Sequence, residues 1–178
     1  MHRRPPRPRG FTLPEALAAL AVLAILLAMA LPAMRALLVR HRTLATVNEL
    51  VASAQLARSL AVTRRSTAVL CPSQEGRRCS GQIDWTQGWI VFDAPDAKGQ
   101  PTASSRIAQH VARGDAPATR ILASAGRRAL RYNALGFSGG SNLTLRICEG
   151  DRLRARVIVN NTGRPRTEMR DGTAPCEG

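Results

Sequence analysis

The segment GRPR, residues 163–166, holds two arginines separated by one proline. Proline fixes φ near about −65° and favours an extended chain, in which side chains two residues apart project to the same side. The guanidinium groups of Arg164 and Arg166 would then lie side by side, and such planar forks match phosphate oxygens bidentately. Gly163 would allow a backbone to approach closely. The segment therefore predicts phosphate binding, although a turn with two solvated arginines is the alternative.

Basic residues are concentrated around this segment. Between residues 120 and 170 there are eleven arginines against three acidic residues, Glu149, Asp151 and Glu168. The whole chain has a formal net charge of +14, which favours an anionic partner such as nucleic acid or a membrane surface. In a strand, alternating arginines at 152, 154 and 156 would share one face. We therefore expect the phosphate-binding surface to extend over Arg127, Arg128, Arg152, Arg154, Arg156 and Arg170.

The composition also indicates which form of nucleic acid would bind. Aromatic residues make up 3% of the chain, so stacking platforms for single-stranded bases are poorly supplied. Electrostatic, sequence-independent binding to the phosphate backbone of double-stranded DNA fits the composition better.

Catalytic chemistry finds little support. The only histidines are His2, His41 and His110, and no Ser-His-Asp arrangement, H-E-x-x-H segment, phosphate-binding P-loop or dinucleotide fingerprint is present. No cluster of acidic residues supports glycosidase or metal-dependent nuclease chemistry. We therefore expect a protein that is not an enzyme and that needs no cofactor.

Four cysteines indicate either disulfides or a metal site. Their even number favours two disulfides if this region lies outside the cytoplasm. Three pairings are possible, and the simplest joins nearest neighbours, Cys71 to Cys79 and Cys148 to Cys176. A zinc site is less favoured because there is no C-x-x-C pair and no histidine near any cysteine.

The N-terminal region consists of a basic segment and an apolar run. Residues 1–10 carry four arginines and three prolines, and from Ala16 to Met34 there is no ionisable side chain. A run of about 20 apolar residues can cross a bilayer as a helix, and a carboxylate at its start, here Glu15, usually has a partner. An ordinary secretory signal would instead be cut after the apolar run, where Ala28-Met29-Ala30 loosely matches a cleavage site.

The order of these features resembles the type IV pilin and pseudopilin family. The matching residues are the basic leader and Gly10-Phe11-Thr12-Leu13-Pro14-Glu15, followed by the apolar helix. The resemblance implies that prepilin peptidase cuts after Gly10 and methylates Phe11. It also implies that Glu15 pairs with a subunit's cationic amine inside the membrane and so guides assembly with other pilins. Pro14 departs from the aliphatic residue usual in the family. A capping box, Thr12-x-x-Glu15, is the structural alternative.

The remaining pattern predicts an α+β pilin fold. Apolar residues recur at helical spacing over 44–61, and we expect one long helix from about Leu13 to Arg64, after which short strand-like runs alternate with Gly, Pro and Asn. We expect a cleaved leader over 1–10, a membrane-embedded helical half over 11–39, an amphipathic half over 40–65 and a β-rich periplasmic head domain over 66–178. The expected strands cover 66–71, 88–94, 105–112, 119–124, 129–133, 143–148 and 154–160, with a short last strand at 166–169.

The head region resembles the FimT/GspH branch of the family. The likeness is carried by Cys71-Pro72-Ser73 through Cys79, by the run DWTQGWIVF at 84–92, and by an apolar strand followed by Gly163-Arg164. We expect Trp85 and Trp89 to contribute buried area rather than binding. In the FimT group a G-R-x-R segment near the C-terminus is associated with DNA binding during natural transformation.

Three functions follow from the resemblance and the residues. The first is a FimT-like minor pilin, anchored in the inner membrane before assembly, that captures DNA in a pilus. The second is a GspH-like structural pseudopilin of a type II secretion system. The third, a membrane-anchored periplasmic protein that never assembles, is disfavoured by the Gly10-Phe11 cleavage pattern and Glu15.

Overall fold

The computed structural model describes residues 12–97, 99–114, 118–140 and 142–176, so the expected cleavage site at Gly10 and Phe11 lies outside the described residues. Two compact units are present, Met1–Arg40 and His41–Gly178, and we call the second the head unit. One helix, α1 (Leu13–Arg64), contributes to both.

Within the first unit, α1 has the composition of a membrane-spanning helix. Its most apolar 18-residue window has a mean hydropathy of 2.6, and none of that window is buried. At the start of α1 the Glu15 carboxylate accepts hydrogen bonds from the Thr12 N–H at 3.0 Å and the Thr12 hydroxyl at 2.8 Å. The glutamate therefore forms its half of a capping box in this structure.

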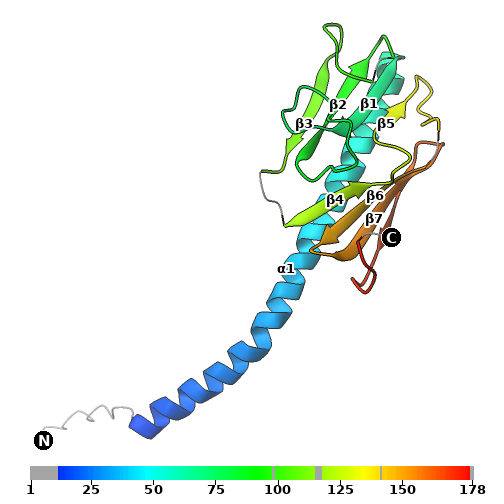
Figure 1. Cartoon of the computed structure of the whole chain (residues 1–178). Helices are drawn as coiled ribbons and strands as arrows, with labels where there is room; N and C mark the ends of the chain where they lie inside the picture. The colour runs from blue at the N-terminus through cyan, green and yellow to red at the C-terminus, as the bar shows by residue number, and fades with distance from the viewer. Residues whose placement is uncertain (1–11, 98, 115–117, 141, 177–178) are drawn as a thin grey trace, which may run out of the picture. The chain divides into compact units, whose positions relative to one another are not determined.

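The head unit contains two four-stranded antiparallel sheets, shown in Figure 1. The first sheet has the order β3-β2-β1-β5 and the second the order β4-β6-β7-β8. The strands are β1 (Thr67–Pro72), β2 (Gly88–Ala94), β3 (Ile107–Ala112), β4 (Thr119–Ala123), β5 (Leu130–Tyr132), β6 (Leu143–Glu149), β7 (Arg152–Val159) and β8 (Pro165–Met169). These confirm the eight expected strands, with small differences at their ends.

The main core lies between α1 and both sheets. Apolar residues of α1 at helical spacing are buried there: Val47, Leu50, Ala54, Ala57 and Ala61. They meet strand residues of both sheets together with Trp85 and Trp89, whose side chains are fully buried. The expectation that both indoles belong to the core is confirmed.

The disulfides join nearest neighbours along the chain. Cys71 is bonded to Cys79 across 5.5 Å between Cα atoms, and Cys148 to Cys176 across 5.8 Å. Cys148 and Cys176 form a small buried cluster with Leu153, so the second bond holds the C-terminal segment against β6 and β7. Of the pairings that the sequence left open, this is the simplest.

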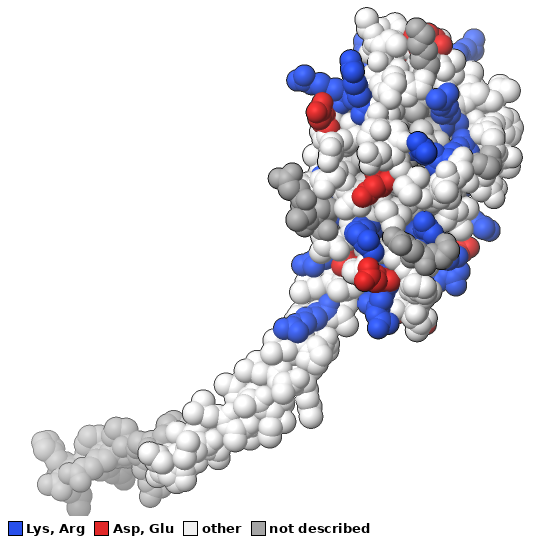
Figure 2. Space-filling view, in the orientation of Figure 1, with Lys and Arg blue, Asp and Glu red and all other residues white. Residues whose placement is uncertain are grey.

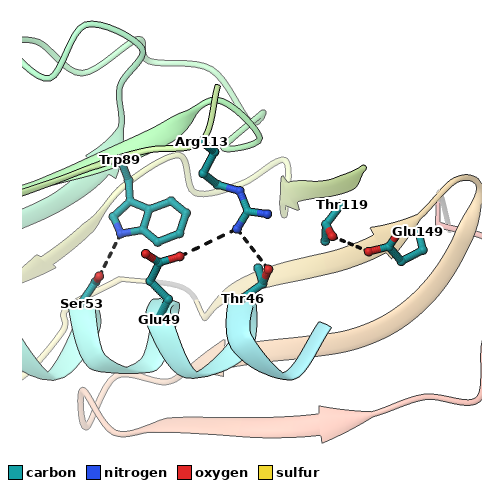
Figure 3. Close-up of polar contacts among 7 residues, drawn as sticks. All are labelled: Thr46, Glu49, Ser53, Trp89, Arg113, Thr119 and Glu149. Carbon is teal, nitrogen blue, oxygen red and sulfur yellow. Dashed lines mark hydrogen bonds and ion pairs between the residues drawn. The ribbon is translucent and has the colours of Figure 1, made fainter. Parts of the chain in front are cut away.

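One buried hydrogen bond joins α1 to the first sheet. The Trp89 indole N–H donates to the Ser53 hydroxyl at 2.9 Å, and both residues are fully buried (Figure 3). Because a buried donor without a partner is costly, this bond stabilises the placement of Trp89 against the helix.

We expect Ser53→Ala to destabilise the head unit by about 1–3 kcal/mol, because the Trp89 N–H would lose its buried acceptor. Urea unfolding followed by tryptophan fluorescence measures this as a lower midpoint. Ser59→Ala is the matched control, since Ser59 is exposed on the same helix and its replacement should change stability by less than about 0.5 kcal/mol. Equal midpoints for the two variants would contradict the assigned role.

Candidate nucleic-acid interface

The turn between β7 and β8 is fixed by Gly163. This residue is buried with φ +75°, a conformation that favours glycine. A Cβ at this position would lie 2.5 Å from the Gly136 carbonyl oxygen and 2.7 Å from the Tyr132 ring. The close approach expected at Gly163 is therefore made by the chain's own β5–β6 loop, and the glycine shapes the turn rather than receiving a ligand.

A hydrogen bond from Tyr132 stabilises this turn. Its hydroxyl donates to the Gly163 carbonyl oxygen at 3.0 Å, and the side chain is fully buried. Burial raises the pKa of Tyr132 to about 12, so the phenol stays protonated and remains a donor at neutral pH.

The two arginines of the turn are presented to solvent. Arg164 is exposed, and within the described part of the chain its guanidinium forms no hydrogen bond or ion pair. Arg166 lies in β8 opposite Ile158 of β7, and its side chain is 68% exposed. One guanidinium is thus available for an anion, and the second is 3.7 Å from the carboxylate of Glu168.

Arg127 supports the turn instead of joining its surface. Its guanidinium donates to the Ala129 carbonyl at 3.2 Å and to the Ser138 hydroxyl at 2.7 Å, while the Ser138 N–H donates to the Asn161 carbonyl at 3.0 Å. Burial lowers the pKa of Arg127 from its usual value. Arg128 points elsewhere and donates to the Gly81 carbonyl at 3.0 Å.

The alternating arginines of β7 share one face, as their spacing predicts. Arg154 and Arg156 are partly exposed between the buried residues Leu153, Ala155 and Val157. However, Arg152 donates to the Gly172 carbonyl at 3.1 Å and Arg154 to the Asp171 carbonyl at 3.0 Å. Both therefore hold the C-terminal segment and are only partly available to a ligand.

The expected arginines fall at two ends of the second sheet. Arg164 and Arg166 are at the β7–β8 turn, whereas the Arg170 N–H donates to the Arg154 carbonyl at the opposite end. From Arg152 to Val159 a strand spans roughly 23 Å at about 3.3 Å per residue. The space-filling view likewise shows basic side chains spread over the head unit and separated by acidic ones (Figure 2).

Glu168 is a functional candidate that the sequence reasoning missed. Its carboxylate lies 3.7 Å from the Arg166 guanidinium and 2.9 Å from that of Arg170. In the strand register, Glu168 of β8 lies opposite Arg156 of β7. An anion that binds Arg166 must therefore displace or face this carboxylate. The signal was the alternation Arg166-x-Glu168-x-Arg170, which places all three side chains on one face of a strand.

A second polar cluster lies between α1, the end of β3 and the start of β4 (Figure 3). Arg113 donates to the Thr46 hydroxyl at 3.1 Å and lies 3.9 Å from the Glu49 carboxylate, while the Thr119 hydroxyl donates to Glu149. Burial lowers the pKa of Arg113, and the charge of Glu49 opposes that shift. Among the residues that the structure describes, no three His, Cys, Asp or Glu side chains gather closely enough to hold a metal ion.

Two protein-family models match this chain. A family model described as "Type II transport protein GspH" matches residues 46–163, and one described as "Prokaryotic N-terminal methylation motif" matches residues 6–31. The chain belongs to the GspH family. The methylation motif implies processing by prepilin peptidase and assembly with other pilins, so this GspH-family chain is a pilin-like or pseudopilin-like subunit. Proteins of these families are structural rather than enzymatic.

One solved structure supports the pilin fold of this GspH-family chain. A crystal structure of the type IV minor pilin FimU from Pseudomonas aeruginosa (strain PAO1), in space group P21, aligns with a TM-score of 0.56 at 18% identity, covering 76% of this chain and 93% of that one. A second FimU structure, in space group P65, aligns with a TM-score of 0.48 at 19% identity, covering 74% and 94%. We find no significant match among curated proteins.

We expect Glu168→Gln to strengthen polyanion binding by roughly two- to tenfold, because it removes the carboxylate that pairs with Arg166 and Arg170 and exposed pairs are worth about 0.2–1 kcal/mol each. Elution from immobilised heparin as salt rises measures this. Asp151→Asn is the matched control, since Asp151 pairs with Arg120 of β4, the strand at the opposite edge of the sheet from β8. The two variants have the same net charge, so equal elution would contradict a local role for Glu168.

Proposed function

We propose that this chain is a FimT-like minor type IV pilin that binds extracellular double-stranded DNA through its phosphate backbone for uptake in natural transformation. The observation that carries the proposal is the exposed guanidinium of Arg164, which has no partner among the described residues and lies two residues from Arg166 on a turn fixed by Gly163 and Tyr132. A guanidinium fork on a fixed turn can bind a phosphate without first being ordered.

The expected binding is electrostatic and independent of sequence. A protein that neutralises phosphates releases condensed counterions, so its affinity falls steeply as salt rises. Non-specific affinities of this kind are typically about 10⁻⁴–10⁻⁶ M at physiological salt. Arg156 and Arg170 extend the surface along the same sheet, and Arg127 acts by positioning the turn.

We expect Arg164→Ala/Arg166→Ala to weaken binding to duplex DNA and to lower the slope of log K against log salt by roughly two, since each arginine neutralises about one phosphate. Titration of the oxidised head unit at several salt concentrations measures both quantities. Unchanged circular dichroism shows that the variant is folded.

Arg77→Ala/Arg78→Ala is the control for net charge, because it removes two exposed arginines from the β1–β2 loop. This control should keep most of the affinity and slope. Binding that is absent, or lost equally in both double variants, would leave the arginine turn without its proposed role.

For assembly, we propose that prepilin peptidase cuts after Gly10 in the inner membrane and methylates Phe11, leaving the head unit in the periplasm. Glu15 then pairs with the cationic amine of a neighbouring subunit. Thr12 remains in the processed chain, so the Glu15 carboxylate would exchange its hydrogen bonds to Thr12 for the amine of the neighbouring subunit. A buried charge in a membrane is tolerated when it is paired.

We expect Glu15→Ala to leave processing intact but to abolish incorporation into filaments, because the carboxylate that favours docking is lost. Immunoblots of cell membranes and of sheared filaments measure the two steps separately, with Glu15→Asp as the conservative control. Normal incorporation of the alanine variant would exclude the pairing.

The second candidate is a structural pseudopilin of a type II secretion system, and the description of the matching family favours it. In that case the head unit contacts other subunits or exported protein, and the arginine turn is a solvated feature. Loss of secretion with no change in DNA uptake, in a strain lacking this chain, would support this candidate over the first.

A further inference from the structure

One aromatic side chain differs from the others in its exposure. Trp85, Trp89, Phe92 and Tyr132 are fully buried, whereas Phe137 is 50% exposed and is the only exposed aromatic residue in the described ranges. Phe137 lies in the β5–β6 loop, in a part of the head unit that otherwise buries its rings. Although the chain has few aromatic residues, one ring is therefore available to a ligand.

The loop that carries Phe137 is held firmly. The Asn133 N–H donates to the Phe137 carbonyl at 3.0 Å, and the Asn133 side-chain oxygen accepts from the N–H groups of Leu135 and Phe137, both at 3.0 Å. The next residue, Ser138, is buried and bonded to Arg127. The ring is thus presented on a fixed backbone, which reduces the entropy cost of using it for binding.

Phe137 is also adjacent to the arginine turn. Of its chain neighbours, Ser138 donates to the Asn161 carbonyl at 3.0 Å, and Gly136 makes the close approach to Gly163. The β5–β6 loop and the β7–β8 turn therefore lie side by side, with the exposed ring of Phe137 on the loop and the exposed guanidinium of Arg164 on the turn.

A hollow of about 310 Å³ opens beside the ring, lined by Thr67, Ala97, Arg131, Tyr132, Asn133, Phe137 and Gly139. Its chemistry suits a nucleobase. Phe137 supplies an apolar π-face, and Arg131 supplies a cationic edge. The Asn133 side-chain oxygen is already occupied, which leaves its NH₂ group as a donor for a base carbonyl. Among the described residues that line the hollow, none is acidic.

We propose that this hollow binds an unpaired nucleobase, stacked on Phe137, while phosphates of the same strand lie against Arg131 and Arg164. The inference rests on the proposed function and narrows its substrate to DNA with a single-stranded end or segment. Stacking on an aromatic side chain tolerates every base, so the chain would gain affinity without sequence preference. This proposal reverses the expectation, drawn from the composition, that the chain has few aromatic side chains on which single-stranded bases can stack.

An exposed ring on a filament subunit could instead contact another protein. Leu135, 75% exposed in the same loop, would suit that role, but it does not line the hollow. The hollow beside Phe137 also contains the guanidinium of Arg131 and the amide of Asn133, and these polar groups favour a nucleotide. Leu135 therefore provides a matched control.

The test compares two strands that have the same phosphates and differ only in their bases. The full processed chain in detergent micelles is titrated with a twelve-nucleotide oligothymidylate and with its fully abasic counterpart. We expect the wild type to bind the thymidylate roughly tenfold more tightly. Phe137→Ala should abolish this preference and leave abasic-strand binding unchanged, Phe137→Trp should keep it, and Leu135→Ala should not alter it.

Each outcome separates the inference from the proposed function. Equal binding of the two strands by the wild type, or an unchanged preference in Phe137→Ala, would overturn the inference, while arginine-dependent binding to duplex DNA would still support the function. An Arg164→Ala/Arg166→Ala variant that keeps both the base-dependent preference and the wild-type affinity for the abasic strand would keep the nucleobase site and remove the proposed role of the turn. A Phe137→Ala variant that binds both strands as the wild type does but fails to enter filaments would assign the ring to a protein contact.

Discussion

The close packing of small side chains of α1 against both sheets is the constraint on which the head unit depends. Ala54, Ala57 and Ala61 are buried at helical spacing, and their size lets residues of β1, β5, β6 and β7 join a single core. Because β5 belongs to the first sheet and the β7–β8 turn to the second, the bond from Tyr132 to Gly163 joins the two sheets. The position of the arginine turn therefore depends on the packing of both sheets against the helix as well as on this bond.

Much of this fold could be predicted from local patterns in the sequence. The helical spacing over 44–61 predicted the face of α1 that is buried, and alternating or continuous apolar runs predicted the strands, because burial imposes these periods directly. Strand order and the division into two sheets could not be predicted in this way. They depend on which non-adjacent segments meet, as when β1 pairs with both β2 and β5, and no local period encodes that choice.

The candidate site was predictable in its parts and not in its assembly. GRPR and the alternation in β7 follow from residue types and a period of two. The roles of Arg127 and Arg152 did not follow from the sequence, because Arg127 donates to the Ser138 hydroxyl and Arg152 to the Gly172 carbonyl, and neither partner is close in the chain. Phe137 was missed for a related reason: the sequence placed it in a loop, but only the neighbouring contacts show that the loop is rigid and lies beside Gly163.

The carboxylate of Glu168 has a kinetic consequence. Because it is attached to the same strand as Arg166, it is present at a high effective concentration whenever a bound phosphate loosens. It can recapture the guanidinium before the phosphate returns, which shortens the residence time of a ligand more than it slows its arrival. A filament subunit built in this way would hold a polyanion through many brief contacts, and it could pass the polymer onward without a separate step to release it.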